Sequence, residues 1–294
     1  MRLLIRLASS VAVALIQGAF CLPTEHVGFA TAGYVQQAYY PPDANCAEFF
    51  VPVSVAPEVV QFKFPRWAND PELVDFLAVA TTRQTPNTQS PIGDTIKQNA
   101  TFRIAASFCS PKAASDRAKT VILATHGIGQ ARSHWNSPFR PEEFNFVQFA
   151  ISQGYSVFFY DRVGQGSSQK ISGFENQINI NVEVLKELSK IVRSGAVTRG
   201  IGKPEKLALI GYSFGSYITH AAVGTSPEIA DAVVLTAIGL NQTSVNVNGL
   251  VRSFVPRIAN QQDRKFADFD NGYLTWADKS VQINTSASPP VESI

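Results

Sequence analysis

The sequence predicts an α/β protein whose central sheet is mostly parallel and covered by helices on both faces. From residue 120 onward, short apolar runs alternate with helical patterns, the order expected of parallel strands joined by crossover helices. Residues 120–125 and 231–237 are also nearly continuous in apolar residues, as strands buried on both faces are. We therefore expect both strands to be buried, with helices packed against each face of the sheet.

The chain before residue 120 predicts two more strands and one helix. Residues 48–56 favour a strand, and Pro52 within it favours an edge position because proline cannot donate a hydrogen bond to a neighbouring strand. Residues 100–110 alternate as a second strand does. A helix is expected within residues 67–80, whereas residues 81–98 are rich in Thr, Pro, Asn and Gln and predict a loop.

The rest of the chain predicts four further strands and three helices. The strands are expected at residues 120–125, 155–160, 207–210 and 231–237, and the helices at 142–153, at 178–193 and directly after residue 213. The sheet then has six core strands. Past residue 240 the pattern dissolves into polar stretches with scattered aromatic residues, which indicates a cap or lid over the mouth of the sheet.

The first 21 residues have the pattern of a secretory signal peptide. Arg2 and Arg6 form a basic start, residues 7–20 are largely apolar, and small residues stand at the −3 and −1 positions of a cut after Cys21. No later apolar run is long enough for a stable membrane span. The expected division is a signal peptide at 1–21, a core at 22–239 and a cap with a tail at 240–294, in a secreted protein.

Two cysteines remain after the leader, Cys46 and Cys109. An even pair in an oxidising compartment predicts one disulfide, and two buried free thiols are the alternative. Three N-glycosylation sequons, at Asn99, Asn241 and Asn284, agree with export. No spacing of His and Cys predicts a metal site, and no motif predicts a cofactor.

The charge balance excludes one class of partner. The formal net charge is +2, and without Arg2 and Arg6 of the leader the basic and acidic residues are equal in number. A neutral chain without a basic stripe gives no reason to expect a nucleic-acid partner. The expected partner is a small-molecule substrate.

The segment from Gly211 to Gly215 reads Gly-Tyr-Ser-Phe-Gly between an apolar strand and a helical pattern. In this position Gly-x-Ser-x-Gly is typical of a nucleophile elbow, a turn so tight that only glycine fits two residues either side of Ser213. The amide of Phe214 would then face a developing oxyanion at the start of the helix. The alternative is a turn of small residues that packs a helix onto the sheet.

A second signal follows the strand at 120–125, where the sequence reads His126-Gly127-Ile128. The loop at this place supplies the second oxyanion amide in enzymes with such an elbow, here that of Ile128. His126 would orient the loop, which is compatible with a hydrogen bond to a loop carbonyl. The glycine-rich stretch at 161–168 superficially resembles a phosphate loop, but it lacks the lysine of a P-loop and predicts a structural turn.

Together these motifs resemble the α/β-hydrolase superfamily and, more narrowly, secreted fungal α/β-hydrolases of the AB hydrolase-1 type, many of them linked to secondary metabolism. The resemblance covers roughly residues 46–280 and rests on THGIG, GYSVFFYDRVGQGSS, LIGYSFGS and NGYL. It implies that Ser213 attacks an acyl carbonyl, that the amides of Phe214 and Ile128 bind the oxyanion, and that an acid–His pair activates the serine.

The sequence departs from that pattern after the serine. The triad order in this fold is serine, then acid, then histidine. Of the four histidines (His26, His126, His134 and His220) only His220 follows Ser213, and it lies about two helical turns along the next helix. The acidic residues of the cap (Asp263, Asp268, Asp270 and Asp278) are expected to be solvated. The fold is therefore expected to be truncated after the sixth core strand, with its base unidentified.

The leading hypothesis is a secreted serine hydrolase of the esterase or lipase type that acts on a small uncharged or apolar ester-like substrate. One alternative is a catalytically incompetent binding protein with the same fold, or a truncated gene product. A second alternative is an acyltransferase or lyase, which only substrate profiling separates from a hydrolase.

Overall fold

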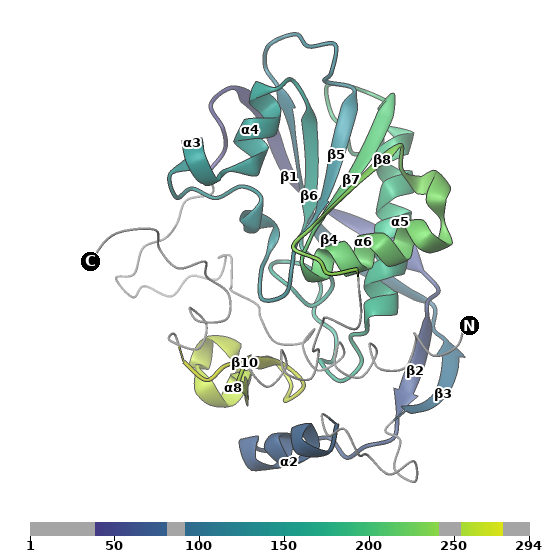
Figure 1. The fold of residues 1–294 in the computed structure, drawn as a ribbon, viewed down its shortest axis with the longest axis vertical. Coiled ribbons are helices and arrows are strands. Elements are labelled where there is room, and N and C mark those ends of the chain that lie inside the picture. Colours follow the sequence, from purple (N-terminus) through teal and green to yellow (C-terminus); the bar gives the residue numbers. More distant parts are fainter. Residues whose placement is uncertain (1–38, 81–91, 241–253, 279–294) are drawn as a thin grey trace.

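A six-stranded sheet forms the centre of the computed structural model, which describes residues 39–80, 92–240 and 254–278 (Figure 1). The strand order is β1-β4-β6-β5-β7-β8. The strands are β1 (Ala44–Val55), β4 (Ala100–Pro111), β5 (Thr120–Thr125), β6 (Ser156–Tyr160), β7 (Lys206–Tyr212) and β8 (Ala232–Thr236). From β6 to β8 the neighbours pair in parallel, and β1 and β4 join antiparallel at one side. The predicted mostly parallel sheet of six strands is confirmed.

Helices cover both faces of this sheet, as predicted. The longer helices α5 (Ile178–Ser194) and α6 (Phe214–Thr225) bury their apolar stripes in the main core cluster, through residues such as Leu185 and Ile218. On the opposite face α4 (Phe146–Ser152) packs Val147, Ala150 and Ile151 against the sheet. Figure 1 shows α4 and the short α3 (Pro141–Phe144) at the left of the sheet and α5 and α6 at its lower right.

The single helix predicted at 142–153 is in fact two. α3 (Pro141–Phe144) ends before Asn145, and α4 begins directly after it. Asn145 has extended backbone angles, and its Oδ1 accepts a hydrogen bond of 2.7 Å from the amide of Gln148. Asparagine is a preferred N-cap because its side chain satisfies an amide that the helix leaves unpaired. The capping residue therefore divides the apolar pattern.

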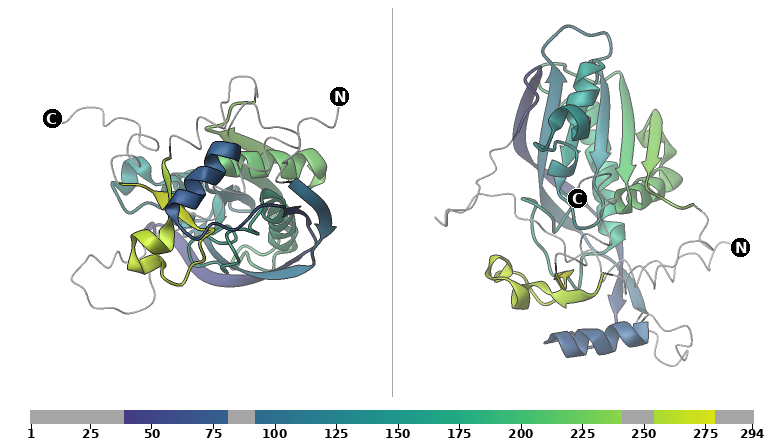
Figure 2. Two further views of the ribbon diagram at one scale, coloured as in Figure 1. Left: turned by 90° about the horizontal axis from the view of Figure 1, so that it is seen from below. Right: turned by 60° about the vertical axis from the view of Figure 1, so that its left-hand side comes forward.

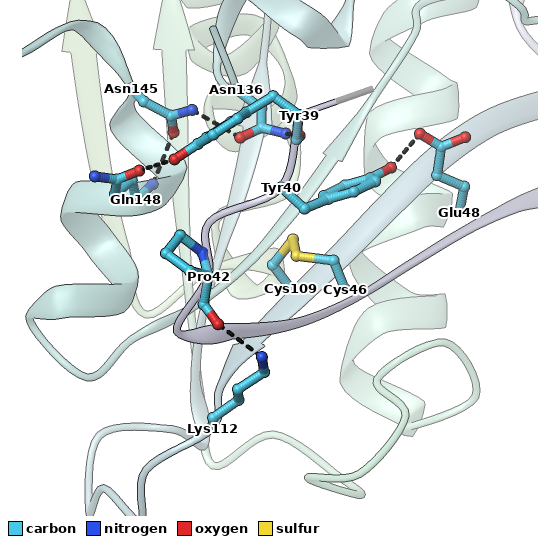
Figure 3. The surroundings of a disulfide bond; sticks show 10 residues. All are labelled: Tyr39, Tyr40, Pro42, Cys46, Glu48, Cys109, Lys112, Asn136, Asn145 and Gln148. Carbon is cyan, nitrogen blue, oxygen red and sulfur yellow. Dashed lines mark hydrogen bonds between the residues drawn. A yellow bond between two sulfur atoms is a disulfide. The ribbon is translucent and has the colours of Figure 1, made fainter. Parts of the chain in front are cut away.

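The edge strand β1 is attached to β4 by a disulfide between Cys46 and Cys109, as predicted. The two cysteines are direct partners in the antiparallel register, and Pro52 lies in the outermost strand. Figure 3 shows the segment before β1 held in place by side-chain hydrogen bonds. The bonds are Tyr39 to Gln148, Tyr40 to Glu48, Asn136 to the Tyr39 carbonyl, and Lys112 to the Pro42 carbonyl.

Loss of this disulfide should destabilise the protein measurably. The bridge closes a loop across a sequence separation of 63 residues. A loop of that length predicts that Cys46→Ser with Cys109→Ser lowers the free energy of unfolding by roughly 2–4 kcal/mol. Urea unfolding of the double variant checks this value. Non-reducing peptide mapping checks the bridge itself, and two alkylatable thiols in the native protein would contradict it.

The loop predicted at 81–98 is wrong in its last part. Residues Ile92–Lys97 form β3, which pairs antiparallel with β2 (Glu58–Phe62). Residues 94–97 of β3 are exposed, so the strand is stabilised by backbone pairing with β2 rather than by burial. A strand without a buried face leaves no alternating pattern in the sequence, and this explains the missed prediction.

A separate group of elements lies below the sheet in Figure 1 and faces the viewer in the left view of Figure 2. It combines α2 (Asp70–Ala80) with β9 (Pro256–Ile258), α8 (Ala259–Gln262) and β10 (Leu274–Trp276). Their shared apolar cluster contains Trp67, Leu73, Leu77, Phe254, Ile258 and Leu274. Asp70 Oδ1 accepts a hydrogen bond of 2.8 Å from the amide of Ile258, 188 residues along the chain. We call residues 64–80 and 254–278 together the composite cap.

Strand β8 is exposed, contrary to the prediction for residues 231–237. The side chains of Val233 and Val234 are 39% and 48% exposed. β8 is the last strand of the sheet, and within the described residues it pairs only with β7. An apolar sequence shows what a strand can bury and not whether anything covers it.

No helix of the described residues is long and apolar enough to cross a membrane.

The exposed edge predicts aggregation of residues 22–294. An unpaired apolar edge strand is a template for pairing with another chain. Val234→Lys should raise the fraction of soluble monomer, because edge lysines oppose such pairing. Val74→Lys on α2 is the matched control, since Val74 is also 48% exposed but lies on a helix. Size-exclusion chromatography measures the fraction of soluble monomer. An equal rise in both variants would show that any added surface charge improves solubility and that pairing at the edge of β8 is not the cause of aggregation.

Candidate active site

Ser213 lies between β7 and α6 in a conformation that few non-glycine residues adopt, with φ 51° and ψ −116°. Such backbone strain persists only where the surroundings enforce it, and it is concentrated at functional sites. Gly211 and Gly215 provide the necessary space. A Cβ on Gly211 would lie 2.6 Å from Ser216 Cα, and one on Gly215 would lie 2.1 Å from the Thr125 carbonyl oxygen. The turn therefore has the geometry of a nucleophile elbow.

The backbone of Ser213 is fixed while its hydroxyl is left unused. Its amide donates to the Thr236 carbonyl at 2.9 Å, and its carbonyl accepts from the Ser216 amide at 2.8 Å. The side chain is half-buried and does not cap the helix. Within the described residues the hydroxyl has no hydrogen-bond partner. A partly accessible hydroxyl on a rigid turn is suited to nucleophilic attack.

The two predicted oxyanion segments are in contact. The glycine of the second segment, Gly127, lies against the elbow, because a Cβ on it would be 3.0 Å from Tyr212 Cδ1. The start of α6 is close to the same loop, because a Cβ on Gly215 would be 2.7 Å from the His126 carbonyl oxygen. Phe214 is the first residue of α6, so its amide is among those that a helix cannot satisfy internally.

The peptide between Gly127 and Ile128 has a defined orientation. The Gly127 carbonyl accepts hydrogen bonds from His126 Nδ1 at 2.9 Å and from Arg162 Nη2 at 3.0 Å, both of them buried. The described residues contain no cis peptide bond, and in a trans peptide the N–H points opposite to the C=O. The amide of Ile128 therefore points away from these two side chains, and within the described residues no hydrogen bond occupies it.

His126 cannot act as a base in this arrangement. Its Nε2 accepts a hydrogen bond of 3.1 Å from the amide of Arg162, so the proton of the neutral ring is on Nδ1, which donates to the Gly127 carbonyl. Burial, and then the nearby charge of Arg162, lower the pKa of His126 well below its usual value. Both ring nitrogens are occupied, and the residue orients the loop.

Arg162 is a residue that the sequence reasoning missed. Its side chain is fully buried, and its guanidinium carbon lies 4.9 Å from the centre of the Phe214 ring. Burial lowers the pKa of Arg162 to about 10, so the group is charged at neutral pH. The only available signal was its position as the second residue of the glycine-rich stretch that follows β6.

The glycine-rich stretch itself is a structural turn, as the residues predicted. Its first residue, Asp161, is fully buried and accepts from the Arg132 amide at 2.7 Å, from Arg132 Nη1 at 2.8 Å and from the Ser167 amide at 2.9 Å. Burial raises the pKa of Asp161, and the charge of Arg132 opposes that rise. Gly166 packs directly on this carboxylate, since its Cβ would lie 2.2 Å from Asp161 Cγ.

The described histidines do not supply a base to Ser213. His220 is exposed on α6, two turns from the elbow. The His134 ring packs 4.5 Å from the ring of Tyr212, and burial lowers its pKa to about 4. Neither ring makes a hydrogen bond with Ser213 within the described chain. His26 lies outside the described residues.

The predicted cap carboxylates have other roles or face solvent. Asp263 accepts from the Lys265 amide at 3.0 Å, and Asp270 accepts from the amides of Gly173 and Gly272 at 3.1 and 3.0 Å. Asp268 is exposed. Across residues 39–80, 92–240 and 254–278 no group of three or more His, Cys, Asp or Glu could hold a metal ion.

Apolar side chains pack beside the predicted oxyanion loop. Ile128 packs against both the main core cluster and the cluster of the composite cap. The cap cluster is rich in aromatic rings: Trp67 lies 4.8 Å from Phe174 and 5.1 Å from Phe76 between ring centres.

Of the predicted glycosylation sites, Asn99 is exposed between β3 and β4, and Asn241 and Asn284 lie outside the described residues.

Comparison with known proteins places this site in a family. Residues 117–268, more than half of the chain, match the family model described as serine aminopeptidase, S33. The match includes both oxyanion segments and the elbow. No curated protein is similar enough to the chain to count as a match.

Solved structures of hydrolases are similar to part of the chain. An esterase of Pyrococcus furiosus aligns with 19% identity and a TM-score of 0.36, over 48% of this chain and 47% of its own. Epoxide hydrolase I of potato (Solanum tuberosum) aligns with 15% identity and a TM-score of 0.34, over 48% of this chain and 38% of its own. The 2-hydroxy-6-oxo-6-phenylhexa-2,4-dienoate hydrolase of Rhodococcus sp. strain RHA1 aligns with 20% identity and a TM-score of 0.32, over 48% of this chain and 45% of its own. The aligned part spans less than half of each of these chains.

Proposed function

Because the chain belongs to the α/β-hydrolase family described as serine aminopeptidase, S33, we propose that it is a serine hydrolase of the esterase type with Ser213 as its nucleophile. The observation that carries this proposal is the strained backbone of Ser213, at φ 51°, held between two glycines that have no room for a Cβ. A turn that only packed a helix onto the sheet would not require a serine in this conformation.

The proposed reaction uses the geometry directly. Ser213 Oγ forms a bond to an acyl carbon, and the carbonyl oxygen becomes an oxyanion that accepts hydrogen bonds from the amides of Phe214 and Ile128. The carbon–oxygen bond to the leaving alcohol then breaks, and the alcohol leaves with the proton. Water releases the acid from the serine in a second step. Both steps need a base, which the described residues do not present to Ser213.

For the substrate we propose a small ester that is uncharged or apolar at its acyl side. This is supported by the contact of Ile128 with the aromatic cluster of the composite cap, which places apolar side chains next to one oxyanion donor. The formal net charge of +2 offers no strong field to attract a charged substrate.

We also propose that the protein is exported. The signal-peptide pattern of residues 1–21 supports export, and so does a disulfide of the kind that forms in oxidising compartments. The exposed turn at Asn99 would be accessible to glycosylation. Glycosidase treatment of secreted material before and after Asn99→Gln tests that site.

The test of the proposed function is covalent labelling followed by substrate profiling. A fluorophosphonate probe should label Ser213, and Ser213→Ala should remove the label. Aryl esters of increasing acyl length should be cleaved in preference to amino-acid arylamides, the substrates of an aminopeptidase. Labelling that survives Ser213→Ala would contradict the assignment of the nucleophile. A chain that binds esters without labelling would be the binding protein that is the main alternative.

A further inference from the structure

The guanidinium of Arg162 is buried without the partners that such a group needs. A buried charge is costly unless it is paired and hydrogen-bonded. The neighbouring carboxylate of Asp161 is bound instead by Arg132 and by the Ser167 amide. Nε and Nη1 of Arg162 are buried and have no hydrogen-bond partner within the described residues. Stability therefore does not explain this side chain, and buried polar atoms of this kind call for a functional reason.

The contacts of Arg162 point to that reason, because they involve both proposed oxyanion segments: the carbonyl of Gly127, which precedes Ile128, and the ring of Phe214. Nη2 donates to the Gly127 carbonyl at 3.0 Å, and this carbonyl belongs to the peptide whose other end is the Ile128 amide. The guanidinium carbon lies 4.9 Å from the centre of the Phe214 ring. The backbone amide of Arg162 donates to His126 Nε2. His126 is the second side chain that donates to the Gly127 carbonyl, through its Nδ1.

We propose that Arg162 is a positioning residue of the oxyanion hole, which fixes the Gly127–Ile128 peptide and the Phe214 ring and places a buried positive charge beside both donor segments. The inference rests on the proposed function of Ser213. Arg162 does not touch the substrate. It acts through the two amides. Its planar guanidinium can hold them in alignment, and its buried charge strengthens their attraction for an oxyanion.

Arg162→Met tests the proposal, because it removes the charge and the hydrogen bond and leaves an apolar chain of similar length. Loss of one oxyanion donor costs about 10²–10³ in rate, so a displaced donor should slow labelling of Ser213 by a fluorophosphonate about tenfold to a hundredfold. The temperature of half-unfolding should stay unchanged or rise, because an unpaired buried charge has been replaced by an apolar group. Arg162→Lys, which keeps the charge but not the planar fork, should recover part of the rate.

Arg132→Met is the matched control. Arg132 lies in the same region with its side chain 13% exposed, but it is paired with the buried Asp161. Its removal should lower the temperature of half-unfolding and slow labelling less than Arg162→Met does. The proposal is overturned if Arg162→Met labels at the wild-type rate, or if it loses rate only together with stability, as a purely structural residue would.

A second measurement does not depend on reactivity. In the ¹⁵N-labelled protein, the amide resonances of Ile128 and Phe214 should move in Arg162→Met and remain in place in Arg132→Met. If wild-type Ser213 does not label at all, the proposed function fails, while the resonances still decide whether Arg162 orients these amides. Should Arg162→Met not fold, Arg162→Lys decides: wild-type labelling with unmoved Ile128 and Phe214 resonances would overturn the inference.

Discussion

Replacing Gly215 by alanine should strongly destabilise the protein, whereas the same replacement at Gly224 in the same helix should stabilise it. A Cβ on Gly215 would lie 2.1 Å from the Thr125 carbonyl oxygen and 2.7 Å from that of His126. Both are backbone atoms that cannot rotate away, so we expect a loss at the upper end of the usual overpacking range, about 3 kcal/mol or more. No atom lies within 4 Å of a Cβ on Gly224, and alanine is favoured over glycine inside a helix by about 0.5–1 kcal/mol.

Urea unfolding of both variants measures the two effects, and probe labelling measures a third. To make room for the new methyl group of Gly215→Ala, α6 must move away from the loop after β5. The Phe214 amide moves with α6, so Ser213 should lose its reactivity even under conditions in which the variant still folds. The Gly224→Ala variant should label like the wild type. Equal stability of the two variants would show that α6 does not pack against the end of β5 at this distance.

The parts of this protein that were readable in the sequence are those where the chain itself imposes the structure. The elbow could be predicted because a strained serine requires glycine on both sides, and those glycines are local sequence features. The disulfide could be predicted because only one pair of cysteines remains after the leader. Pro52 indicated the edge strand because proline cannot donate to a further neighbour.

The parts that were missed depend on distant partners. β3 forms only because β2 pairs with it, and its exposed residues leave no apolar pattern. The exposure of β8 depends on what covers the sheet, which an apolar strand does not reveal. The composite cap joins residues 64–80 to 254–278, and no local pattern in either stretch indicates the other. Likewise Arg162 is ordinary in the sequence, and its importance follows from complete burial beside Gly127 and Phe214.

The 294-residue chain should react slowly at Ser213 in spite of its well-formed elbow. A serine hydroxyl is a weak nucleophile until an adjacent base removes its proton. Within the described residues His126 has both ring nitrogens occupied, His220 is exposed on α6, and neither His220 nor His134 makes a hydrogen bond with Ser213. In a serine protease, loss of the catalytic histidine costs about 10⁶ in kcat, and the oxyanion hole with substrate binding retains about 10³–10⁴ over water.

Added imidazole should therefore raise the rate of labelling and of aryl ester cleavage, because it supplies from solution a base that the described residues do not present to Ser213. The gain should increase with imidazole concentration and with pH up to about 7–8, as the neutral base replaces the protonated form. Ser213→Ala should abolish the gain, and this control separates rescue of the serine from direct hydrolysis by imidazole. If the chain instead labels as fast as an ordinary esterase without imidazole, a base already acts on Ser213, and His134 beside Tyr212 would be the first histidine to replace.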